Sequence, residues 1–253
     1  ISGYSKGETN MRIAGMGSIG GGEYTDDIKI SGSGKITGNV KCMAMSCSGA
    51  AKVQGDITAV NDIRVSGSGK FEGNVECASI TVSGAAKVCG ALTVEQEADF
   101  SGDLKCSGKI KCGKLAIYGH IKSEDDIEAD NVYIGGSIDC DGLINAERVE
   151  IKLDRSSSEV TSIGGSEIKV HTGKCASFVN KASLLQKIVG GKIGTLTVAE
   201  SIEGDEIHLE NVKAPLVIGR VVHISDGCEI ETVRYSEKIE VSESSKVKET
   251  IKE

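Results

Sequence analysis

The sequence predicts an all-β protein, a parallel β-helix whose short strands wind into a triangular solenoid with about 17–18 residues in each coil. Three observations lead to this prediction. The chain repeats itself at a fixed period, glycines recur at fixed positions of the repeat, and apolar residues two apart close every unit.

The repeat is clearest over Ser31–Phe100, which splits into two halves offset by 35 residues with 17 identical aligned positions. Each half divides again into units of 17 and 18 residues. Seven units then tile residues 31–151, and they begin at Ser31, Ser48, Ser66, Ser83, Ser101, Tyr118 and Gly135. An eighth unit before them fits in part, because it has Gly15, Ile19 and Gly21 at matching positions.

The aligned units form columns of one residue type. The second position is glycine in all seven units: Gly32, Gly49, Gly67, Gly84, Gly102, Gly119 and Gly136. The tenth position is always aliphatic: Val40, Ile57, Val75, Leu92, Ile110, Ile127 and Ile144. Glycine suits corners because it has no Cβ to clash, and apolar residues two apart indicate strands with one buried face. One coil cannot bury that face alone, so we expect the coils to stack as parallel strands.

The regular pattern covers only part of the chain. We expect an N-terminal extension at residues 1–13 and one β-helix domain at 14–241, with regular coils over 31–151. The polar stretch 154–162 predicts a loop between coils, and residues 175–191 predict a short amphipathic insertion. Coils resume over 192–241, and the charged residues 242–253 predict a frayed tail.

Composition excludes several classes of protein. Glycine is 33 of 253 residues without a three-residue period, and proline occurs once, which argues against both collagen and disorder. Because the chain has 29 basic and 37 acidic residues and few aromatic residues, a nucleic-acid partner is not expected. No apolar run approaches the length of a transmembrane helix, although peripheral membrane contact stays open.

The nine cysteines do not predict a disulfide framework or a zinc site, since their number is odd and no C-x-x-C spacing occurs. Cys42, Cys77 and Cys112 share an inward column but occupy alternate coils, roughly 9.6 Å apart, which is beyond disulfide reach. We therefore expect free thiols that act as small hydrophobic side chains in a reducing compartment.

Two outward columns are candidate binding surfaces. The fifth position is lysine in six successive units: Lys35, Lys52, Lys70, Lys87, Lys105 and Lys122. This cationic stripe could hold an anionic lipid, a wall polymer or a neighbouring filament, or it could simply be a solvated face. His208, His223 and Glu240 form the second column, which could bind a metal if they lie on adjacent coils; chance surface placement is the alternative.

Nothing in the sequence favours an enzyme or a bound cofactor. The acidic residues are scattered and do not form the carboxylate cluster of pectate-lyase-like solenoids. The apolar steps of 4, 2, 3 and 2 residues differ from the six-residue step of hexapeptide acyltransferases. No G-x-S-x-G, P-loop or H-E-x-x-H motif occurs either.

Two segments, Arg12–Cys42 and Glu203–Val233, together with the repeated glycine–aliphatic units between them, resemble the bactofilin family of bacterial polymer-forming cytoskeletal proteins. The resemblance implies a right-handed β-helix that assembles into filaments without nucleotide. It also implies a cytoplasmic scaffold, in some members at the inner face of the membrane, for proteins of cell shape, cell wall synthesis or motility. The chain is longer than a minimal core of the family, and Ile1–Asn10 offers no hydrophobic anchor.

A physical route to polymerisation follows from the solenoid itself. Each open end exposes unpaired backbone groups and a slice of apolar core. We expect Ile28 and Ile30 near one end, and Ile239 and Val241 near the other, to contact further copies of the chain. The alternatives are a monomeric β-helix binding module, such as an adhesin or a flagellar-assembly partner, and a β-helix enzyme with a clustered acidic or histidine site.

Overall fold

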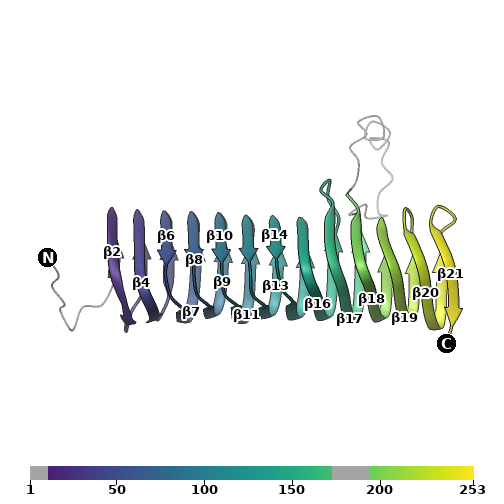
Figure 1. Cartoon of the computed structure of the whole chain (residues 1–253), viewed down its shortest axis with the longest axis horizontal. Helices are drawn as coiled ribbons and strands as arrows, with labels where there is room; N and C mark the ends of the chain where they lie inside the picture. The colour runs from purple at the N-terminus through teal and green to yellow at the C-terminus, as the bar shows by residue number, and fades with distance from the viewer. Residues whose placement is uncertain (1–10, 173–193) are drawn as a thin grey trace, which may run out of the picture. The chain divides into compact units, whose positions relative to one another are not determined.

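The computed structural model describes residues 11–172 and 194–253 (Figure 1). All regular secondary structure within these two ranges is β-strand, and none of it is helical. The chain divides into two compact units, residues 1–130 and residues 131–253, here called unit 1 and unit 2. Their boundary falls within strand β15 (Ile127–Ile134).

Unit 1 is built from short strands. They are β1 (Met11–Ile13), β2 (Met16–Glu23), β3 (Ile28–Ile30), β4 (Ser33–Cys42), β5 (Met45–Cys47), β6 (Ala50–Val53), β7 (Ile57–Val65), β8 (Ser68–Phe71), β9 (Val75–Val82), β10 (Ala85–Val88), β11 (Leu92–Phe100), β12 (Asp103–Cys106), β13 (Ile110–Ile117) and β14 (His120–Ser123). The pairings between them are all parallel, and each joins a strand to its equivalent one coil further along. The predicted parallel β-solenoid is therefore confirmed.

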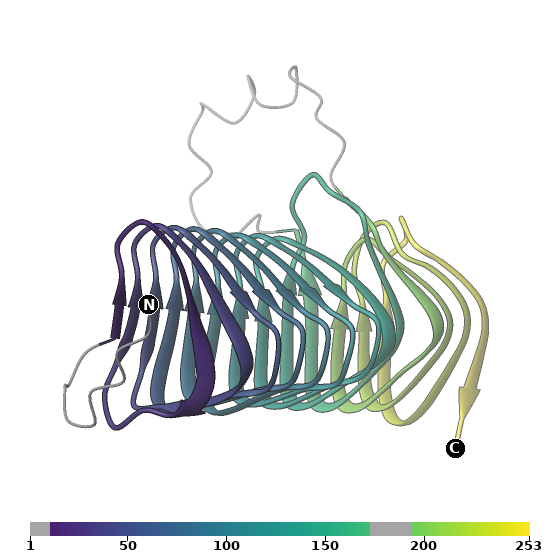
Figure 2. The same cartoon turned by 60° about the vertical axis from the view of Figure 1, so that its left-hand side comes forward.

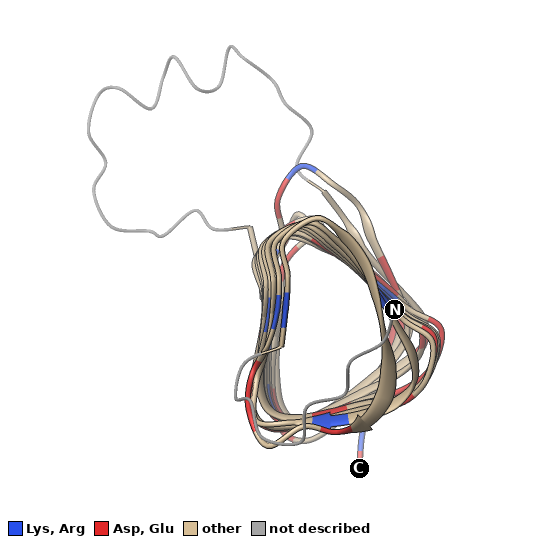
Figure 3. Cartoon of the chain, turned by 90° about the vertical axis from the view of Figure 1, so that its left-hand side faces the viewer, with Lys and Arg blue, Asp and Glu red and all other residues tan. Residues whose placement is uncertain are grey.

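Each coil of unit 1 has three sides, as the view along the stack shows (Figure 3), and the coils follow one another in the oblique view (Figure 2). The first side consists of strands β6, β8, β10, β12 and β14 and the first half of β4. Strands β7, β9 and β11 supply the other two sides and turn the corner between them at a register shift, for example between Ala59 and Asp62. The aligned columns of the sequence are thus true columns in space.

Glycine is required at the corner that joins one coil to the next. A Cβ atom on Gly84 would lie 2.0 Å from the carbonyl oxygen of Gly67, and one on Gly67 would lie 2.0 Å from that of Gly49. At the same corner, the N–H of Ser83 donates to the carbonyl of Val65 at 2.9 Å. The backbones approach so closely that no side chain fits between the stacked coils, which explains the glycine column.

At a second corner, side-chain oxygens of one coil accept hydrogen bonds from backbone N–H groups of the next coil. The N–H of Asp56 donates to Asn39 Oδ1 at 3.0 Å, and the N–H of Asn74 donates to Asp56 Oδ1 at 2.7 Å. The N–H of Ala91 then donates to Asn74 Oδ1 at 2.9 Å. Because each carboxamide or carboxylate accepts a hydrogen bond from a backbone N–H of the next coil, hydrogen bonds link successive coils at this corner.

The core of unit 1 consists of the inward residues of all three sides. Strand β9 shows the alternation, with Val75, Cys77, Ile80 and Val82 buried and the intervening residues more exposed. The largest side chains, Phe71 and Phe100, are fully buried. Ser123 is buried as well, and its hydroxyl donates to the carbonyl of Asp125 at 2.8 Å, so the core retains no unsatisfied hydroxyl there.

Unit 2 is built from longer strands that continue round the corners. They are β16 (Ser137–Lys152), β17 (Ser158–His171), β18 (Leu196–Leu209), β19 (Val212–Ile224), β20 (Glu229–Val241) and β21 (Lys246–Lys252). Each pairs in parallel with the next, from β16 through to β21. Its core is aliphatic, with Ile163, Ile202 and Val217 stacked in register and buried.

Three boundaries differ from those expected from the sequence. The charged residues 242–253 are not a frayed tail, because β21 pairs in register with β20 over Glu229–Tyr235. The loop predicted at 154–162 is shorter, since β17 begins at Ser158, whose buried hydroxyl accepts the N–H of Ile138. At the N-terminal side, Met11–Ile13 form β1 and pair with β3. In all three places backbone pairing extends the sheet, and at 158–162 and 246–252 it does so through residues whose side chains are mostly polar.

Two further predictions are not tested. The insertion expected at 175–191 lies outside the described residues. The expectation that residues 14–241 form one domain stays a prediction, because units 1 and 2 are each compact by themselves.

Candidate functional site

The predicted lysine column is a continuous ladder on the first side of unit 1. The register pairs each member with the next: Lys35 with Lys52, Lys52 with Lys70, Lys70 with Lys87, Lys87 with Lys105, and Lys105 with Lys122. None of these side chains is buried. Viewed along the stack, bands of basic residues follow one another on one side of the coils (Figure 3). We call these six residues the lysine ladder.

Acidic partners compensate part of the ladder. Glu72 lies between two rungs, 2.8 Å from Lys70 Nζ and 3.0 Å from Lys52 Nζ. The hydrogen bond from Lys70, followed by that from Lys52, lowers the pKa of Glu72 to about 2. Glu124 lies 2.7 Å from Lys105, and this bond lowers the pKa of Glu124.

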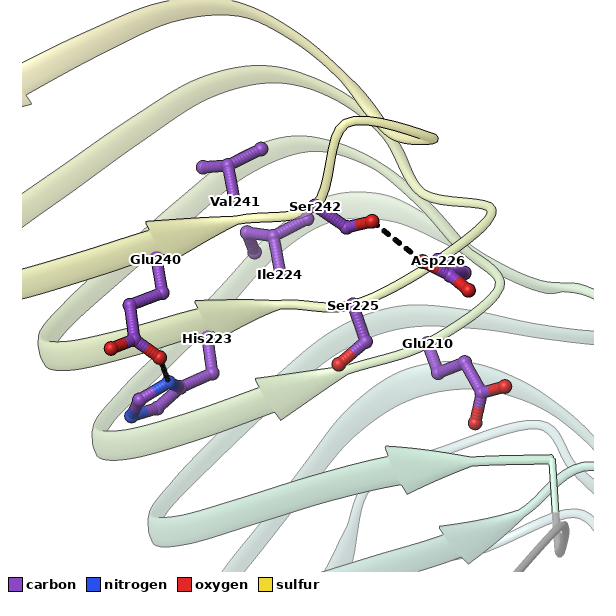
Figure 4. Close-up of a pocket in the computed structure, with 8 residues that line it drawn as sticks. All are labelled: Glu210, His223, Ile224, Ser225, Asp226, Glu240, Val241 and Ser242. Atoms are coloured by element: carbon purple, nitrogen blue, oxygen red, sulfur yellow. Dashed lines mark hydrogen bonds and ion pairs between the residues drawn. The ribbon is translucent and has the colours of Figure 1, made fainter. Parts of the chain in front are cut away.

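The histidine column also exists as expected, on the face of unit 2. The register aligns His208 with His223 and His223 with Glu240, so the three occupy adjacent coils. The two imidazole rings are stacked, with centroids 4.4 Å apart and an interplanar angle of 6°. His208 Nε2 lies 2.9 Å from Glu206. His223 Nδ1 lies 2.7 Å from Glu240, as Figure 4 shows.

This arrangement does not form a metal site. No group of three or more His, Cys, Asp or Glu side chains with metal-binding geometry occurs within 11–172 and 194–253. The physical reason is the stacking: a shared zinc ion would lie about 2.0–2.1 Å from one nitrogen of each ring, and parallel rings do not converge on one point. The metal hypothesis for His208, His223 and Glu240 is therefore wrong, and each imidazole contacts a carboxylate instead.

A shallow polar depression of about 510 Å³ lies beside this column near the C-terminal edge of unit 2 (Figure 4). Its lining residues are Glu210, His223, Ile224, Ser225, Asp226, Glu240, Val241 and Ser242. Ser242 and Ser244 donate to Asp226 at 2.5 and 2.7 Å, and these two bonds lower the pKa of Asp226. Lys238 and then His223 lower the pKa of Glu240. Glu210 accepts hydrogen bonds from the N–H and the hydroxyl of Thr172 at 2.8 and 2.6 Å. The depression is thus rimmed by three carboxylates, each of which has close partners.

The two C-terminal candidates for contact with further copies, Ile239 and Val241, lie on strand β20 near the C-terminal edge of unit 2. Strand β21 covers β20 only as far as Tyr235, so Ile239 and Val241 have β19 on one side and no strand on the other within the described residues. Ile239 is half-buried, and Val241 is 42% exposed. An aliphatic pair therefore lies on a strand with a free backbone edge.

The N-terminal prediction needs correction. Ile28 and Ile30 belong to β3, which lies between β1 and β5, and both side chains are buried. They contribute to the core and do not lie at an open edge. In the part of the chain that the structure describes, β1 and β2 have no partner on their outer side, and Met16 of β2 is 94% exposed. The sequence missed this because the partial eighth unit looked like the last coil, whereas β1 begins another.

The cysteines behave as expected of core residues. Eight lie in the described residues, all with free thiols, and only Cys89 among them is exposed. Burial raises the pKa of Cys77 and of Cys112 to about 12, and that of Cys42 to about 11. Such thiols are not nucleophiles at neutral pH.

Taken together, stacked identical coils, an aliphatic core and free strand edges define a structural solenoid protein. The family described as "Bactofilin: Polymer-forming cytoskeletal" matches the chain over residues 1–93 and 48–125. The chain belongs to the bactofilin family through these overlapping segments, which cover nearly all of unit 1. Residues 126–253 lie outside both matched segments.

Two curated relatives come from Bacillus subtilis (strain 168). "Uncharacterized protein YhbF" is 36% identical over 111 residues, which is 44% of this chain and 42% of the relative. "Uncharacterized protein YhbE" is 39% identical over 95 residues, which is 38% of this chain and 36% of the relative. The matches therefore span about two fifths of the length of these relatives. No solved structure matches the chain. No helix in the described residues is long and apolar enough to cross a membrane.

Proposed function

We propose that the protein is a self-assembling cytoskeletal scaffold whose copies stack end to end through the open edges of their solenoid coils, without nucleotide. Membership of a polymer-forming family supports self-association. End-to-end stacking is supported by the C-terminal edge of unit 2. Ile239 and Val241 lie in the last part of β20, which pairs with β19 and extends beyond its pairing with β21. An uncovered strand edge is a template for pairing with another chain.

The driving forces are those that already hold the coils together. A second copy would pair its backbone with the free edge of β20 and cover the exposed side chain of Val241. Full burial of one aliphatic side chain stabilises a contact by about 1.5–3 kcal/mol. At the N-terminal edge, Met16 and the outer side of β2 offer a comparable surface. Because neither backbone pairing nor the burial of aliphatic side chains involves a phosphate or an active site, assembly of this kind requires no nucleotide.

The same proposal extends to the cellular role. A filament of this kind would repeat its outward columns along its length and so present many copies of one surface to other proteins. We propose cell-shape, cell-wall or motility proteins as its clients, at the cytoplasmic side of the membrane. The competing function, a monomeric binding module, would use the same faces of single molecules and leave the edges unused.

The test replaces the aliphatic pair of the C-terminal edge. We expect I239D/V241D to remain folded, because neither side chain is fully buried, and to stay monomeric in sedimentation and negative-stain imaging without nucleotide. The control T81D/T93D adds the same charge at exposed residues of unit 1 and should still form filaments. Far-ultraviolet circular dichroism checks folding of both variants. Filaments of I239D/V241D, or a wild-type chain that stays monomeric at high concentration, would refute the model.

A further inference from the structure

We propose that the lysine ladder of unit 1 binds a linear polyanion that carries phosphate groups. The inference goes beyond self-assembly and does not depend on it, because the ladder lies on the side of the coils and is complete in a single chain. It starts from the register: six ammonium groups occupy equivalent positions on six consecutive strands.

The geometry of the ladder is that of a straight track. Neighbouring strands lie about 4.8 Å apart, so six rungs extend over roughly 24 Å along the stack. The adjacent outward column consists mostly of small exposed residues: Ser33, Ala50, Ser68, Ala85, Asp103 and His120. Small side chains beside the lysines leave space for a ligand that lies along them.

The charge of the ladder is not balanced by the protein. Glu72 is shared by Lys52 and Lys70, so these two rungs together keep one positive charge in excess. Lys35 and Lys87 form no ion pair within 11–172 and 194–253. The whole chain carries a formal charge of −8, so this excess is local. Ammonium groups this close repel one another, and a bound anion relieves that repulsion.

The residue type and the width of the ladder identify the partner. All six positions are lysine and none is arginine, and lysine binds phosphate as a point charge without demanding a planar, bidentate group. The ladder is one side chain wide, which fits a single-file polymer. A membrane would instead need a broad basic face or a broad exposed apolar surface. Of the large exposed apolar residues of unit 1, Val60 and Tyr118 lie outside the strands that pair along the ladder side, and Met16 is a single side chain in register with Ser33 at one end of that side.

The experiment measures binding of fluorescently labelled long-chain inorganic polyphosphate to the full chain over a series of salt concentrations. The variant K35Q/K87Q/K122Q removes three rungs that have no ion pair within 4 Å in the described structure. The control K29Q/K41Q/K111Q removes the same charge from three other positions of unit 1, none of which is buried. We expect the ladder variant to weaken binding about tenfold or more, and the control less than about twofold. The slope of log K against log salt should fall by about 2, or roughly 0.7 for each lysine removed.

Three results would overturn the proposal. Equal losses for the two variants would show that only net charge matters. Absence of polyphosphate binding by the wild type near physiological salt would show that the ladder is a solvated face. Ladder-dependent binding to vesicles of phosphatidylserine and phosphatidylcholine, without binding to polyphosphate, would assign the surface to a membrane. Because I239D/V241D leaves the ladder intact, it should bind polyphosphate as the wild type does, whatever its assembly state.

Discussion

Units 1 and 2 build parallel coils in two different ways. In unit 1 the strands are short, and the corner between coils is closed by a glycine column in which each Cβ would strike the carbonyl of the previous coil. In unit 2, five strands of 13–16 residues run through the corners. There a glycine column is only three deep, Gly165, Gly204 and Gly219, and Tyr235 occupies the next position.

The difference shows what a solenoid coil needs. Backbone pairing in register and an aliphatic interior are common to both units, whereas the deep glycine column belongs to unit 1. In unit 2 the same close approach is limited to a short column, where a Cβ on Gly165 or Gly204 would lie 2.4 or 2.3 Å from the carbonyl oxygen of the previous coil. Outward positions are free to vary: unit 1 uses them for the lysine ladder, and unit 2 for pairs across coils such as Arg148–Glu167 and Arg220–Glu237. We therefore expect the two units to respond differently to the same kinds of substitution.

The largest effect should come from the glycine corner. Gly84→Ala places a Cβ 2.0 Å from the carbonyl oxygen of Gly67. Neither backbone can move away without breaking hydrogen bonds between the neighbouring strands. We expect a loss of about 4 kcal/mol in the free energy of unfolding, measured by denaturant titration. The control is Gly15→Ala, where nothing lies within 4 Å of the added Cβ and the loss should stay below about 1 kcal/mol. Equal losses would mean that the corner is not what distinguishes unit 1.

A smaller effect is expected from the core of unit 2. Ile207 is fully buried between Ile168 and Val222 of the neighbouring coils, and Ile207→Ala should cost about 3 kcal/mol through lost burial and a residual cavity. Hydrogen-exchange mass spectrometry should locate the loss in β17–β19. Ile251→Ala, at a half-buried position of β21, serves as control and should cost less than about 1.5 kcal/mol. A negligible effect of Ile207→Ala would contradict a packed aliphatic core in unit 2.

Thiol reactivity should report the packing of unit 1. Cys77 is buried and its pKa is raised to about 12, whereas Cys89 is exposed on the neighbouring coil. At pH 8 we expect iodoacetamide to modify Cys89 at least about a hundredfold faster than Cys77, as measured by peptide mapping. The comparison is internal, because the two cysteines lie in one chain. Similar rates would show that the coils open on the timescale of labelling.

The smallest expected effect is the titration of Glu72. Bonds from Lys70 and Lys52 lower its pKa to about 2, so the carboxylate is favoured in the folded state. Its contribution is complete above the ordinary value of 4.5 and is lost as the pH falls toward 2. Carboxyl NMR should show this low pKa, and K52Q/K70Q should raise it toward the ordinary value. An unchanged pKa in the variant would mean that another group holds the carboxylate.

Much of unit 1 could be predicted from the sequence because its columns are repeated. Six lysines at one position, and glycines at another, reveal which residues stack, since every coil presents the same side chain to its neighbours. The register of Lys52 with Lys70 and the burial of Cys77 are consequences of that alignment. The ladder of Asn39, Asp56 and Asn74 was present in the sequence as a column of short polar side chains, but the repeat alone did not show that they accept backbone donors.

The edges and the candidate sites could not be predicted in the same way. Strands β1 and β21 are held by backbone hydrogen bonds, which any residue other than proline can donate. Their side chains therefore need not show the apolar alternation of a strand, and the charged stretch 246–252 does not show it. The same reason explains why Ile28 and Ile30 were placed at an edge when they are core residues.

The sequence by itself determined the coil, its length, its inward residues and the stacking of the lysines, because a periodic chain repeats each local preference at the same place. Only the tertiary structure decided where the stack is open, how the two histidines lie and which lysines have partners. These depend on contacts between particular neighbouring coils, and a repeat cannot encode what differs from one coil to the next.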